Sequence, residues 1–417
     1  MKVLVIGGGG REHAVCRKLS ESKDVTELLC APGNAGIARV ARCIPDVKAM
    51  DIDGIVALAK REKVDFVCVT LALGCVDRLE AEGIAAFGPT AYAAQMEASK
   101  IFSKNLMRKY GIPTARCEIF TEMEKALAYL DTQSAPIVVK ADGLALGKGV
   151  VVAATIDEAK QAVIEMMQGG KFGRSGARVL IEECMVGREV TVLCFCDGKT
   201  IVPMKASQDH KRVFDGDKGP NTGGMGAFAP SLLYTRHIAE RTEREILLPT
   251  LRAMNAEGFT FKGVLYVGLM LTKDGPKVVE YNARFGDPET QVVLPLLDSD
   301  LFAIMRAVRE QRLAEMDIRW KDGAAACVVL ASGGYPGKYE GGKPISGLEE
   351  AEAMGATVYH AGTKRTDAGY VTSGGRVLGV TALGDTLADA IHKAYVAAEQ
   401  IHFDGAHMRR DIGKLDM

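Results

Sequence analysis

The stretch GPKVVEYNARFGDPETQ, residues 275–291, changes from an apolar strand pattern to a run of acid, amide and guanidinium groups around a glycine and a proline. Side chains two residues apart leave a strand by the same face, so Glu280 and Asn282 are expected side by side. A carboxylate next to an amide oxygen suits a hard cation such as Mg²⁺. If the strand continues, Arg284 on the same face would reach a phosphate or carboxylate. The simpler interpretation is a polar strand end that runs into a solvated turn.

The composition is that of a globular protein with several domains. A chain of 417 residues is too long for one ordinary core, so we expect roughly two to four domains. The net charge of -1 argues against a general nucleic-acid binder, and the longest apolar stretches are too short for a membrane helix. Ten cysteines without a CxxC pair favour reduced packing residues in a cytoplasmic protein, and seven dispersed histidines give no zinc pattern. The N-terminus enters a buried-strand pattern directly, without the order of a signal peptide.

The order of the predicted elements divides the chain into four parts. Residues 1–100 alternate short apolar runs with amphipathic helices, which predicts a parallel sheet with helices on both faces. Residues 101–187 begin with a helix that stops at Gly111 and continue as a smaller unit of strands and helices. Residues 188–318 add further strands and a closing helix. The glycine-rich turns and final helix of residues 319–417 indicate a separate α+β cap.

The glycine turn GGGGREH, residues 7–13, follows a strand and precedes a helix, so it could hold a phosphate on the helix N-terminus. The dinucleotide fingerprint GxGxxG would need glycine where Glu12 stands, and the next strand ends LLCA, without the acid that binds ribose. A dinucleotide oxidoreductase is therefore disfavoured. A phosphate site without a dinucleotide and a plain strand-to-helix turn both stay open.

A second glycine loop lies in VVKADGLALGKGVVV, residues 138–152. Gly143 and Gly147 enclose three residues, and Gly149 follows Lys148, so the spacing does not fit a P-loop. A glycine loop between two strands is instead the shape of a flap whose backbone amides close over phosphates, and Lys140 would add a point charge. A plain hairpin that contains a lysine is the alternative.

Two polar segments follow. In VLIEECMVGREV, residues 179–190, a strand runs into a linker whose backbone could bind an adenine while Glu189 takes the ribose hydroxyls; a solvated turn would look the same. The loop QDHKRVFDGDKGPNTGGMGAF, residues 208–228, is too long and too charged for a simple hairpin. Long loops dense in polar groups are often functional, so we expect this one to bind substrate.

Together these motifs resemble the phosphoribosylamine–glycine ligases (glycinamide ribonucleotide synthetases) of the ATP-grasp superfamily. The resemblance runs from GGGGREH, APGNAG and FGPT through VVKADGLALGKGV, SQDHKR, GDKGPNTGGMG and LYVGLM to EYNARFGDPETQ and ASGGYPGKY, and so covers essentially the whole chain. It implies an ATP-grasp fold of class α/β, with an N-terminal parallel-sheet domain (1–100), a flap domain (101–187), a central domain (188–318) and a C-terminal cap (319–417).

The resemblance also implies an activity, namely ATP-dependent joining of glycine to 5-phosphoribosylamine through glycyl phosphate, with release of ADP and phosphate in purine biosynthesis. It implies ATP and Mg²⁺ or Mn²⁺ as cofactors, no nucleic-acid or membrane partner, and a monomer or weak homodimer. The implied catalytic residues are Arg284, Lys140 and Asp209, and the implied metal ligands are Glu280 and Asn282. The implied nucleotide-binding residues are Lys104, Lys140, Gly147, Lys148, Gly149, Glu182, Glu183, Val186 and Glu189. The implied substrate-binding residues are Gly9, Gly10, Asn34, Lys211, Asn221, Arg284 and Asp287.

The sequence departs from the family pattern at two places. After Val69 the chain reads VTLALGCVD, about four residues shorter than the acidic turn of the family, and a genuine deletion there would affect the amine site. Tyr281 and Ala283 replace residues of the usual EFNCRFGDPE, but they occupy the alternate, inward positions and leave the metal face intact. The remaining alternatives are another ATP-grasp carboxylate–amine ligase and a non-catalytic nucleotide-sensing module.

Overall fold

The computed structural model describes residues 1–70, 74–143, 149–168 and 176–414. Its first layer is a five-stranded sheet in the order β3-β2-β1-β4-β5, in which every neighbouring pair is parallel. The bounds are β1 Lys2–Gly7, β2 Glu27–Pro32, β3 Arg42–Cys43, β4 Phe66–Val69 and β5 Ala85–Phe87. The parallel sheet predicted for the N-terminal part is confirmed.

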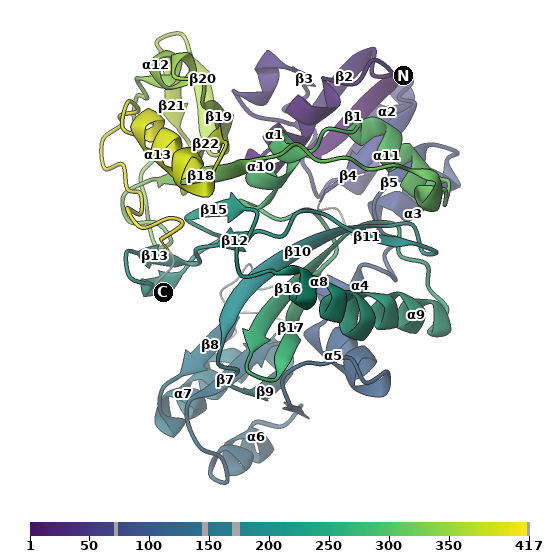
Figure 1. Ribbon diagram of the computed structural model, residues 1–417, viewed down its shortest axis with the longest axis vertical. Helices are drawn as coiled ribbons and strands as arrows, with labels where there is room; N and C mark the ends of the chain where they lie inside the picture. Colours follow the sequence, from purple (N-terminus) through teal and green to yellow (C-terminus); the bar gives the residue numbers. More distant parts are fainter. Residues whose placement is uncertain (71–73, 144–148, 169–175, 415–417) are drawn as a thin grey trace.

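Helices cover both faces of this sheet because its strands are apolar on both sides. Val3 and Val5 of β1 pack with α1 (Gly10–Leu19) and α11 (Leu301–Arg309), whereas Leu4 and Ile6 pack with α2 (Ile52–Arg61) and α3 (Cys75–Ala81). A helix from the third quarter of the chain therefore closes the N-terminal sheet, as Figure 1 shows in green over purple. The glycine turn that begins α1 lies at the carboxyl end of β1, the end of a parallel sheet where ligands bind.

The flap is a four-stranded sheet in the order β6-β9-β7-β8, covered by helices on one side. Two antiparallel neighbours, β7 and β8, border the second glycine loop, of which residues 144–148 lie outside the described residues. Figure 1 shows this sheet at the opposite end of the molecule from the purple N-terminal strands. The bounds are β6 Cys117–Phe120, β7 Ile137–Ala141, β8 Val150–Ala153, β9 Val179–Glu183, α6 Met123–Leu130 and α7 Ile156–Met167.

The central sheet has the order β11-β10-β16-β17 and is antiparallel throughout. One face packs against helices through Val192, Leu265 and Tyr281, and the other joins the core beneath the N-terminal sheet through Leu193 and Phe195. The strands are β10 Arg188–Cys196, β11 Ile201–Pro203, β16 Gly263–Thr272 and β17 Gly275–Asn282. The helices of this part are α4 Gln95–Ala98, α5 Lys100–Lys109, α8 Arg236–Thr242 and α9 Leu248–Ala256, and a π turn, Glu243–Leu247, joins the last two.

The C-terminal cap shares its sheet with the central part of the chain. The order is β12-β15-β18-β22-β19, so β15 pairs with β18 of the cap, and β12 pairs with the other edge of β15. This sheet includes strands from both sides of residue 319, and the division into four domains stays a prediction. The strands are β12 Gln208–Asp209, β15 Gly226–Ala229, β18 Ala324–Ala331, β19 Thr357–His360 and β22 Arg376–Gly384.

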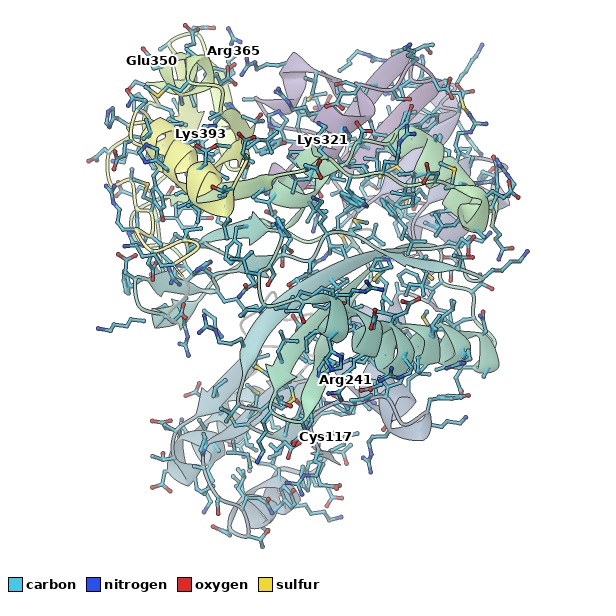
Figure 2. All side chains as sticks on the ribbon, in the orientation of Figure 1. Cys117, Arg241, Lys321, Glu350, Arg365 and Lys393 are labelled. Carbon is cyan, nitrogen blue, oxygen red and sulfur yellow. The ribbon has the colours of Figure 1, made fainter. Side chains whose placement is uncertain are left out.

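Smaller elements complete the cap and residues 208–228, the loop that is predicted to bind substrate and is called the substrate loop below. Charged side chains such as Glu350, Arg365 and Lys393 project from the cap surface in Figure 2, and all three are exposed. The helices are α10 Thr290–Val293, α12 Leu348–Ala353 and α13 Leu387–Ala398, with 3-10 turns at Ile37–Arg39, Leu294–Leu296 and Leu313–Glu315. The hairpins are β13 Arg212–Phe214 with β14 Lys218–Asn221, and β20 Thr363–Thr366 with β21 Gly369–Thr372. Over the described ranges, no helix is long and apolar enough to cross a membrane.

Candidate active site

The two predicted metal ligands lie together at the end of β17. The register of β17 against β16 shifts between Val278 and Glu280, so Val279 is an extra residue in the ladder. Tyr281 is buried in the core and Ala283 is buried beyond the strand end, which confirms both as inward positions. Glu280 and Asn282 are half-buried on the other side, and the bulge thereby turns the acid and amide away from the core.

The carboxylate of Glu280 lies among lysine side chains. It forms no hydrogen bond or ion pair with any other residue that the structure describes. Burial alone would raise its pKa, but Lys211, Lys140 and Lys100 hold the pKa of Glu280 below its ordinary value. Within the described ranges no three His, Cys, Asp or Glu side chains gather to form a complete metal site. The pair therefore fits a cation such as Mg²⁺ that takes its other ligands from phosphates and water.

The two predicted phosphate-binding lysines share one buried carboxylate. Glu182, on β9, lies 3.1 Å from Nζ of Lys104 and 2.8 Å from Nζ of Lys140. Lys104 also donates to Thr114 Oγ1 at 2.8 Å, and Lys140 donates to the carbonyl of Val279 at 3.3 Å. Burial lowers the pKa of Lys104, whereas the two ammonium groups lower the pKa of Glu182 despite its burial. These three side chains lie between helix α5 and the flap sheet, next to the bulge in β17.

Lys100 joins this group, although the sequence motifs assigned it no role. Its ammonium donates to the carbonyl of Gly143 at 2.9 Å, at the start of the glycine loop. Burial lowers the pKa of Lys100, with Glu280 acting in the opposite direction. Gly149 accepts a hydrogen bond from Ala141 N at 2.8 Å, whereas Gly147 and Lys148 lie outside the described residues. The SK pair that begins helix α5 was the available signal for Lys100.

The predicted nucleotide linker follows β9. Glu183 accepts hydrogen bonds from the backbone nitrogen and Nε of Arg116 at 3.0 and 2.9 Å. Val186 is 81% exposed. Glu189, at the start of β10, pairs with the ammonium of Lys211 at 2.6 Å. The linker thus meets the substrate loop through one ion pair.

The first residues of the substrate loop form an acidic and basic cluster beside Glu280. Burial, and after it the carboxylates of Glu289, Glu189 and Glu280, raise the pKa of Asp209 to about 7, with Lys211 opposing the shift. Although burial lowers the pKa of Lys211, Glu189 and Asp209 raise it above its ordinary value. Asp209 therefore changes charge near neutral pH, which is where a group that moves protons is most effective.

The other end of the loop is a hairpin that carries Asn221. This residue is the last of β14 and pairs with Arg212 of β13. Its side chain is half-buried and makes no hydrogen bond with another residue in the described part of the chain.

Arg284 is held at the end of β17. Its Nε donates to Glu97 Oε1 at 3.2 Å and its Nη1 donates to the carbonyl of Phe285 at 3.0 Å. Its Nη2 lies 3.5 Å from Asn282 Oδ1, so Arg284 does lie beside the metal pair. Glu97 also accepts from Ala283 N at 2.8 Å, which makes it a second anchor of this turn. No sequence motif pointed to Glu97.

The glycine turn of the first domain is fixed by its own helix. Glu12 accepts from the backbone nitrogen of Gly9 at 2.8 Å and from Arg11 Nε at 2.6 Å, so it caps the helix where a dinucleotide fingerprint has glycine. A Cβ on Gly10 would lie 2.7 Å from Gln291 Nε2. The Asn34 amide donates to the carbonyls of Gly8 and His360 and accepts two backbone N–H groups at 2.9 Å, so its whole side chain holds this turn and its neighbour.

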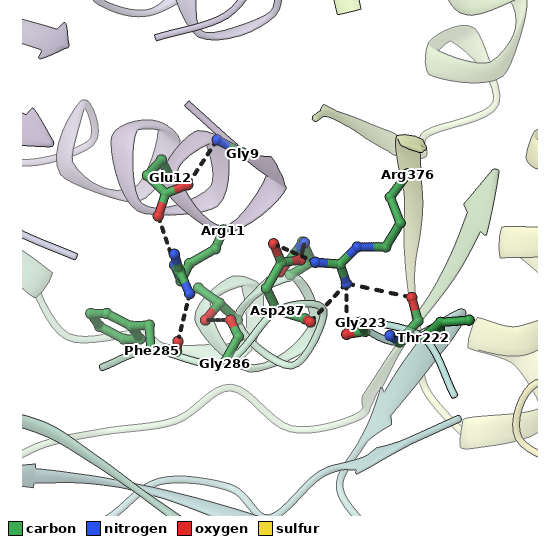
Figure 3. A network of polar contacts seen from close by, with 12 residues as sticks. Gly9, Arg11, Glu12, Thr222, Gly223, Phe285, Gly286, Asp287 and Arg376 are labelled. Carbon is green, nitrogen blue, oxygen red and sulfur yellow. Dashed lines mark hydrogen bonds and ion pairs between the residues drawn. The ribbon is translucent and has the colours of Figure 1, made fainter. Parts of the chain in front are cut away.

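Asp287, in the turn that follows β17, forms an ion pair with the cap. Its carboxylate lies 3.1 Å from Arg376 Nη2 and accepts from Gln291 Nε2 at 2.7 Å (Figure 3). Burial raises the pKa of Asp287, but Arg376 and Arg11 hold it below the ordinary value. Arg376 comes from the far end of the chain, and sequence analysis gave no signal for it. The segment after Val69, which the resemblance predicts to be about four residues short, includes residues 71–73, and these lie outside the described residues.

Comparisons with known proteins agree over the whole chain. The N domain of phosphoribosylglycinamide synthetase matches residues 1–97, its ATP-grasp (A) domain residues 98–290 and its C domain residues 325–415. A phosphoribosylamine–glycine ligase of Nostoc sp. is 49% identical over 421 residues, covering 99% of each chain. The corresponding ligase of Vibrio cholerae is 48% identical over 419 residues, covering 99% of this chain and 98% of the relative.

Solved structures give the same result. A crystal structure of phosphoribosylamine–glycine ligase from Thermotoga maritima superposes with a TM-score of 0.87 at 33% identity, covering 99% of this chain and 100% of the other. The biotin carboxylase domain of Hydrogenobacter thermophilus 2-oxoglutarate carboxylase, in complex with MgADP and bicarbonate, has a TM-score of 0.72 at 18% identity. It covers 98% of this chain and 91% of that one, and at this identity it shows the fold alone.

These matches confirm the predicted ATP-grasp fold, the predicted family and its class of reaction, an ADP-forming carbon–nitrogen ligation. The ATP-grasp model covers Glu182, the two lysines that pair with it, and the strand that carries Glu280. The chain belongs to the phosphoribosylamine–glycine ligase family.

Proposed function

We propose that this chain joins glycine to 5-phosphoribosylamine by first phosphorylating the glycine carboxylate with ATP. A carboxylate is a poor acylating agent, and its phosphorylation creates a good leaving group. The amine of phosphoribosylamine then attacks the carbonyl carbon of glycyl phosphate, the C–O bond to phosphate breaks, and an amide and free phosphate result. Support comes from the family assignment and from a cluster of cations around one ionised carboxylate, Glu280. Another ATP-grasp carboxylate–amine ligase would share that cluster.

Glu280 and Asn282 are proposed to hold a divalent cation, Mg²⁺ or Mn²⁺, on the phosphates of ATP. When bound, the cation neutralises charge on the transferring phosphoryl group. Lys104 and Lys140 are proposed to contact those phosphates, because both ammonium groups are buried near the strand of Glu280. Glu182 pairs with both lysines and so balances their charge before the nucleotide binds.

The nucleotide base and ribose are assigned to the linker. The exposed backbone at Val186 would bind the adenine, and Glu189 would accept from the ribose hydroxyls, in exchange for part of its pairing with Lys211. Glu183 supports the linker by fixing Arg116. The flap loop, through Gly147, Lys148 and Gly149, would cover the phosphates and exclude the water that hydrolyses glycyl phosphate.

The reacting groups are assigned to the other side of the cluster. Arg284, next to Asn282, would stabilise the acyl phosphate, and Lys211 with Asn221 would hold glycine. Asp209 would accept the proton that the attacking amine loses, since its pKa of about 7 matches that task. Gly9 and Gly10, with Asn34 and Asp287 beside them, would place the ribose phosphate at the helix N-terminus.

ADP release tests this proposal. Purified protein is mixed with Mg-ATP, glycine and freshly prepared phosphoribosylamine, and each component is omitted in turn. ADP that forms only in the complete mixture supports the ligation and shows that the segment after Val69 is adequate. ADP with glycine but without the amine means hydrolysis of the acyl phosphate and a damaged amine site. Tight ATP binding without ADP in any mixture refutes catalysis and leaves a nucleotide-sensing module.

A further inference from the structure

One arginine of the C-terminal cap contacts two segments of the candidate site. Arg376 is the first residue of β22, and its side chain is 21% exposed. Its Nη1 donates to the carbonyls of Gly223 and Asp287 at 2.8 Å each and lies 3.4 Å from the carbonyl of Gly224. Its Nη2 lies 3.1 Å from Asp287 Oδ2. Figure 3 shows the guanidinium between Asp287 and the glycine turn of the substrate loop.

The two adjacent glycines in GPNTGGMG, Gly223 and Gly224, leave space for this guanidinium and for Pro288. A Cβ on Gly223 would lie 2.9 Å from Arg376 Cζ, and a Cβ on Gly224 would lie 2.4 Å from Pro288 Cδ. Gly224 also has a φ of +118°, which side chains rarely adopt. The two glycines therefore allow the turn to lie directly against Arg376 and the Asp287–Pro288 segment.

The position of this turn is transmitted to Lys211. The backbone nitrogen of Gly224 donates to Thr222 Oγ1 at 2.9 Å. Thr222 in turn donates from its backbone nitrogen and its hydroxyl to the carbonyl of Lys211, at 2.7 and 2.8 Å. A shift of the glycine turn would therefore move the backbone that carries Lys211.

The other side of Arg376 leads to the N-terminal turn. Asp287 lies so close to this turn that a Cβ on Gly9 would be 3.7 Å from its Oδ2. Arg11, two residues further on, contributes to the lowered pKa of Asp287. Arg376 therefore couples the loop proposed to bind glycine to the turn proposed to bind the ribose phosphate.

We propose that Arg376 is a positioning residue that aligns the amine substrate with the acyl phosphate. The inference rests on the proposed function, since it assigns the amine substrate to the region between Gly9, Asp287 and the 208–228 loop. Loss of the guanidinium would release both the glycine turn and Asp287. A misplacement of about 1 Å can reduce the rate of a bimolecular step about 10²-fold. Within the described part of the chain, Arg376 forms no hydrogen bond or ion pair with Lys104, Lys140 or Glu280, so binding of Mg-ATP should be retained.

The test compares Arg376→Ala and Arg376→Lys with wild type. We expect KM for phosphoribosylamine to rise roughly 10- to 100-fold in Arg376→Ala, with the Kd for Mg-ATP changed less than about threefold. We also expect more than one ADP per amide formed, because glycyl phosphate that is not captured is hydrolysed. Arg376→Lys should recover little, since a single ammonium group cannot replace the planar guanidinium that contacts four oxygen atoms. Arg410→Ala, an exposed arginine of the same cap that pairs with Glu399, is the matched control and should behave as wild type.

Gly223→Ala provides an independent route to the same defect. Its added methyl would displace the guanidinium, so it should reproduce the excess ADP, and the double variant with Arg376→Ala should be no worse than the worse single variant. Additive effects of the two substitutions in the double variant would overturn the inference. Equal losses of affinity for ATP and for the amine, together with a lowered melting temperature, would overturn it as well. An inactive wild type would refute the proposed function, whereas active wild type with fully coupled Arg376→Ala would refute only the role of Arg376.

Discussion

The carboxylate of Glu182 lies 2.8 Å from the ammonium of Lys140 in the buried space between helix α5 and the flap sheet. The same carboxylate pairs with Lys104 at 3.1 Å, so one negative charge holds two buried positive charges in place. One carboxylate thus lies between two ammonium groups at the position where the phosphates of ATP are proposed to bind. The protein therefore prepares a cationic site before its anionic ligand arrives.

Glu182→Gln should destabilise the protein without nucleotide, because it leaves two buried ammonium groups without their counter-ion. Breaking a buried pair typically costs about 3–5 kcal/mol. The neighbouring variant Glu183→Gln is the matched control: Arg116, its partner, is 89% exposed, and an exposed pair contributes about 0–1 kcal/mol. Urea unfolding measures the difference in free energy of unfolding between the two variants. Saturating Mg-ATP should reduce this difference, because its phosphates would balance the charge of the two lysines. Equal stability of the two variants would show that Glu182 does not balance the lysines.

Glu280→Gln should reduce kcat by about 10²-fold or more, because an amide binds a hard cation weakly and offsets less charge on the phosphoryl group. The affinity for glycine should change much less. Asp274→Asn, an exposed acid in the turn of the same hairpin, controls for the loss of one negative charge. Steady-state kinetics at several Mg²⁺ concentrations measures both effects. Near-normal turnover in Glu280→Gln would remove Glu280 from the metal site.

The pH dependence of kcat/KM should show a limb near pH 7. Burial and the surrounding carboxylates raise the pKa of Asp209 to about 7, so the residue is protonated below that pH and can accept a proton only above it. The rate should therefore rise with pH through about 7 and then level off. Lys211 opposes this shift, so Lys211→Met should move the limb to higher pH while lowering the rate. A wild-type profile that is flat between about pH 6 and 8 would contradict the role of Asp209. A limb at the same pH in wild type and Lys211→Met would contradict it as well.

Acid should destabilise the contact between the N-terminal domain and the cap. His13 Nδ1 accepts from the backbone nitrogen of His360 at 2.8 Å, which requires an unprotonated ring nitrogen. Burial lowers the pKa of His13 to about 3 and that of His360 to about 4. Both pKa values lie below the unfolded pKa of about 6.5. Between that pH and the folded pKa of each histidine, the unfolded chain therefore binds more protons than the folded protein. Stability present above pH 6.5 is lost as the pH falls, by up to about 1.4 kcal/mol per pH unit for each histidine.

His13→Asn measures this contribution. Its melting temperature should fall less steeply than that of wild type between about pH 6.5 and 5, although it is less stable at neutral pH. His237→Asn, at an exposed histidine of helix α8, should keep the slope of wild type. Identical slopes for all three proteins would show that the buried histidines do not control the acid response.

Local patterns in the sequence predicted a large part of this structure. Alternating apolar runs and amphipathic helices gave the parallel N-terminal sheet, because burial on both faces leaves a clear periodicity. Strand alternation also placed Glu280 and Asn282 on one face and Tyr281 in the core. These features depend on residues that are neighbours in the chain.

The features that sequence reasoning missed depend on distant residues. The bulge at Val279 exists only as a register shift against β16. Arg376 meets Gly223 across 153 positions, and Glu97 meets Arg284 across 187, with no shared motif. The pairing of β15 with β18 is also long-range, since Ala229 meets Ala325, and no sequence motif joins the two strands. The roles assigned to individual site residues stay predictions that the variants above test.

The most direct test of the central claim follows the oxygen atoms of glycine. If the carboxylate is phosphorylated before the amine attacks, the oxygen that bridges carbon and phosphorus leaves with the phosphate. Glycine labelled with ¹⁸O in both carboxylate oxygens should therefore give phosphate with one ¹⁸O atom per amide formed, measured by mass spectrometry after a single turnover. Phosphate without ¹⁸O, formed together with the amide, would contradict the glycyl phosphate route.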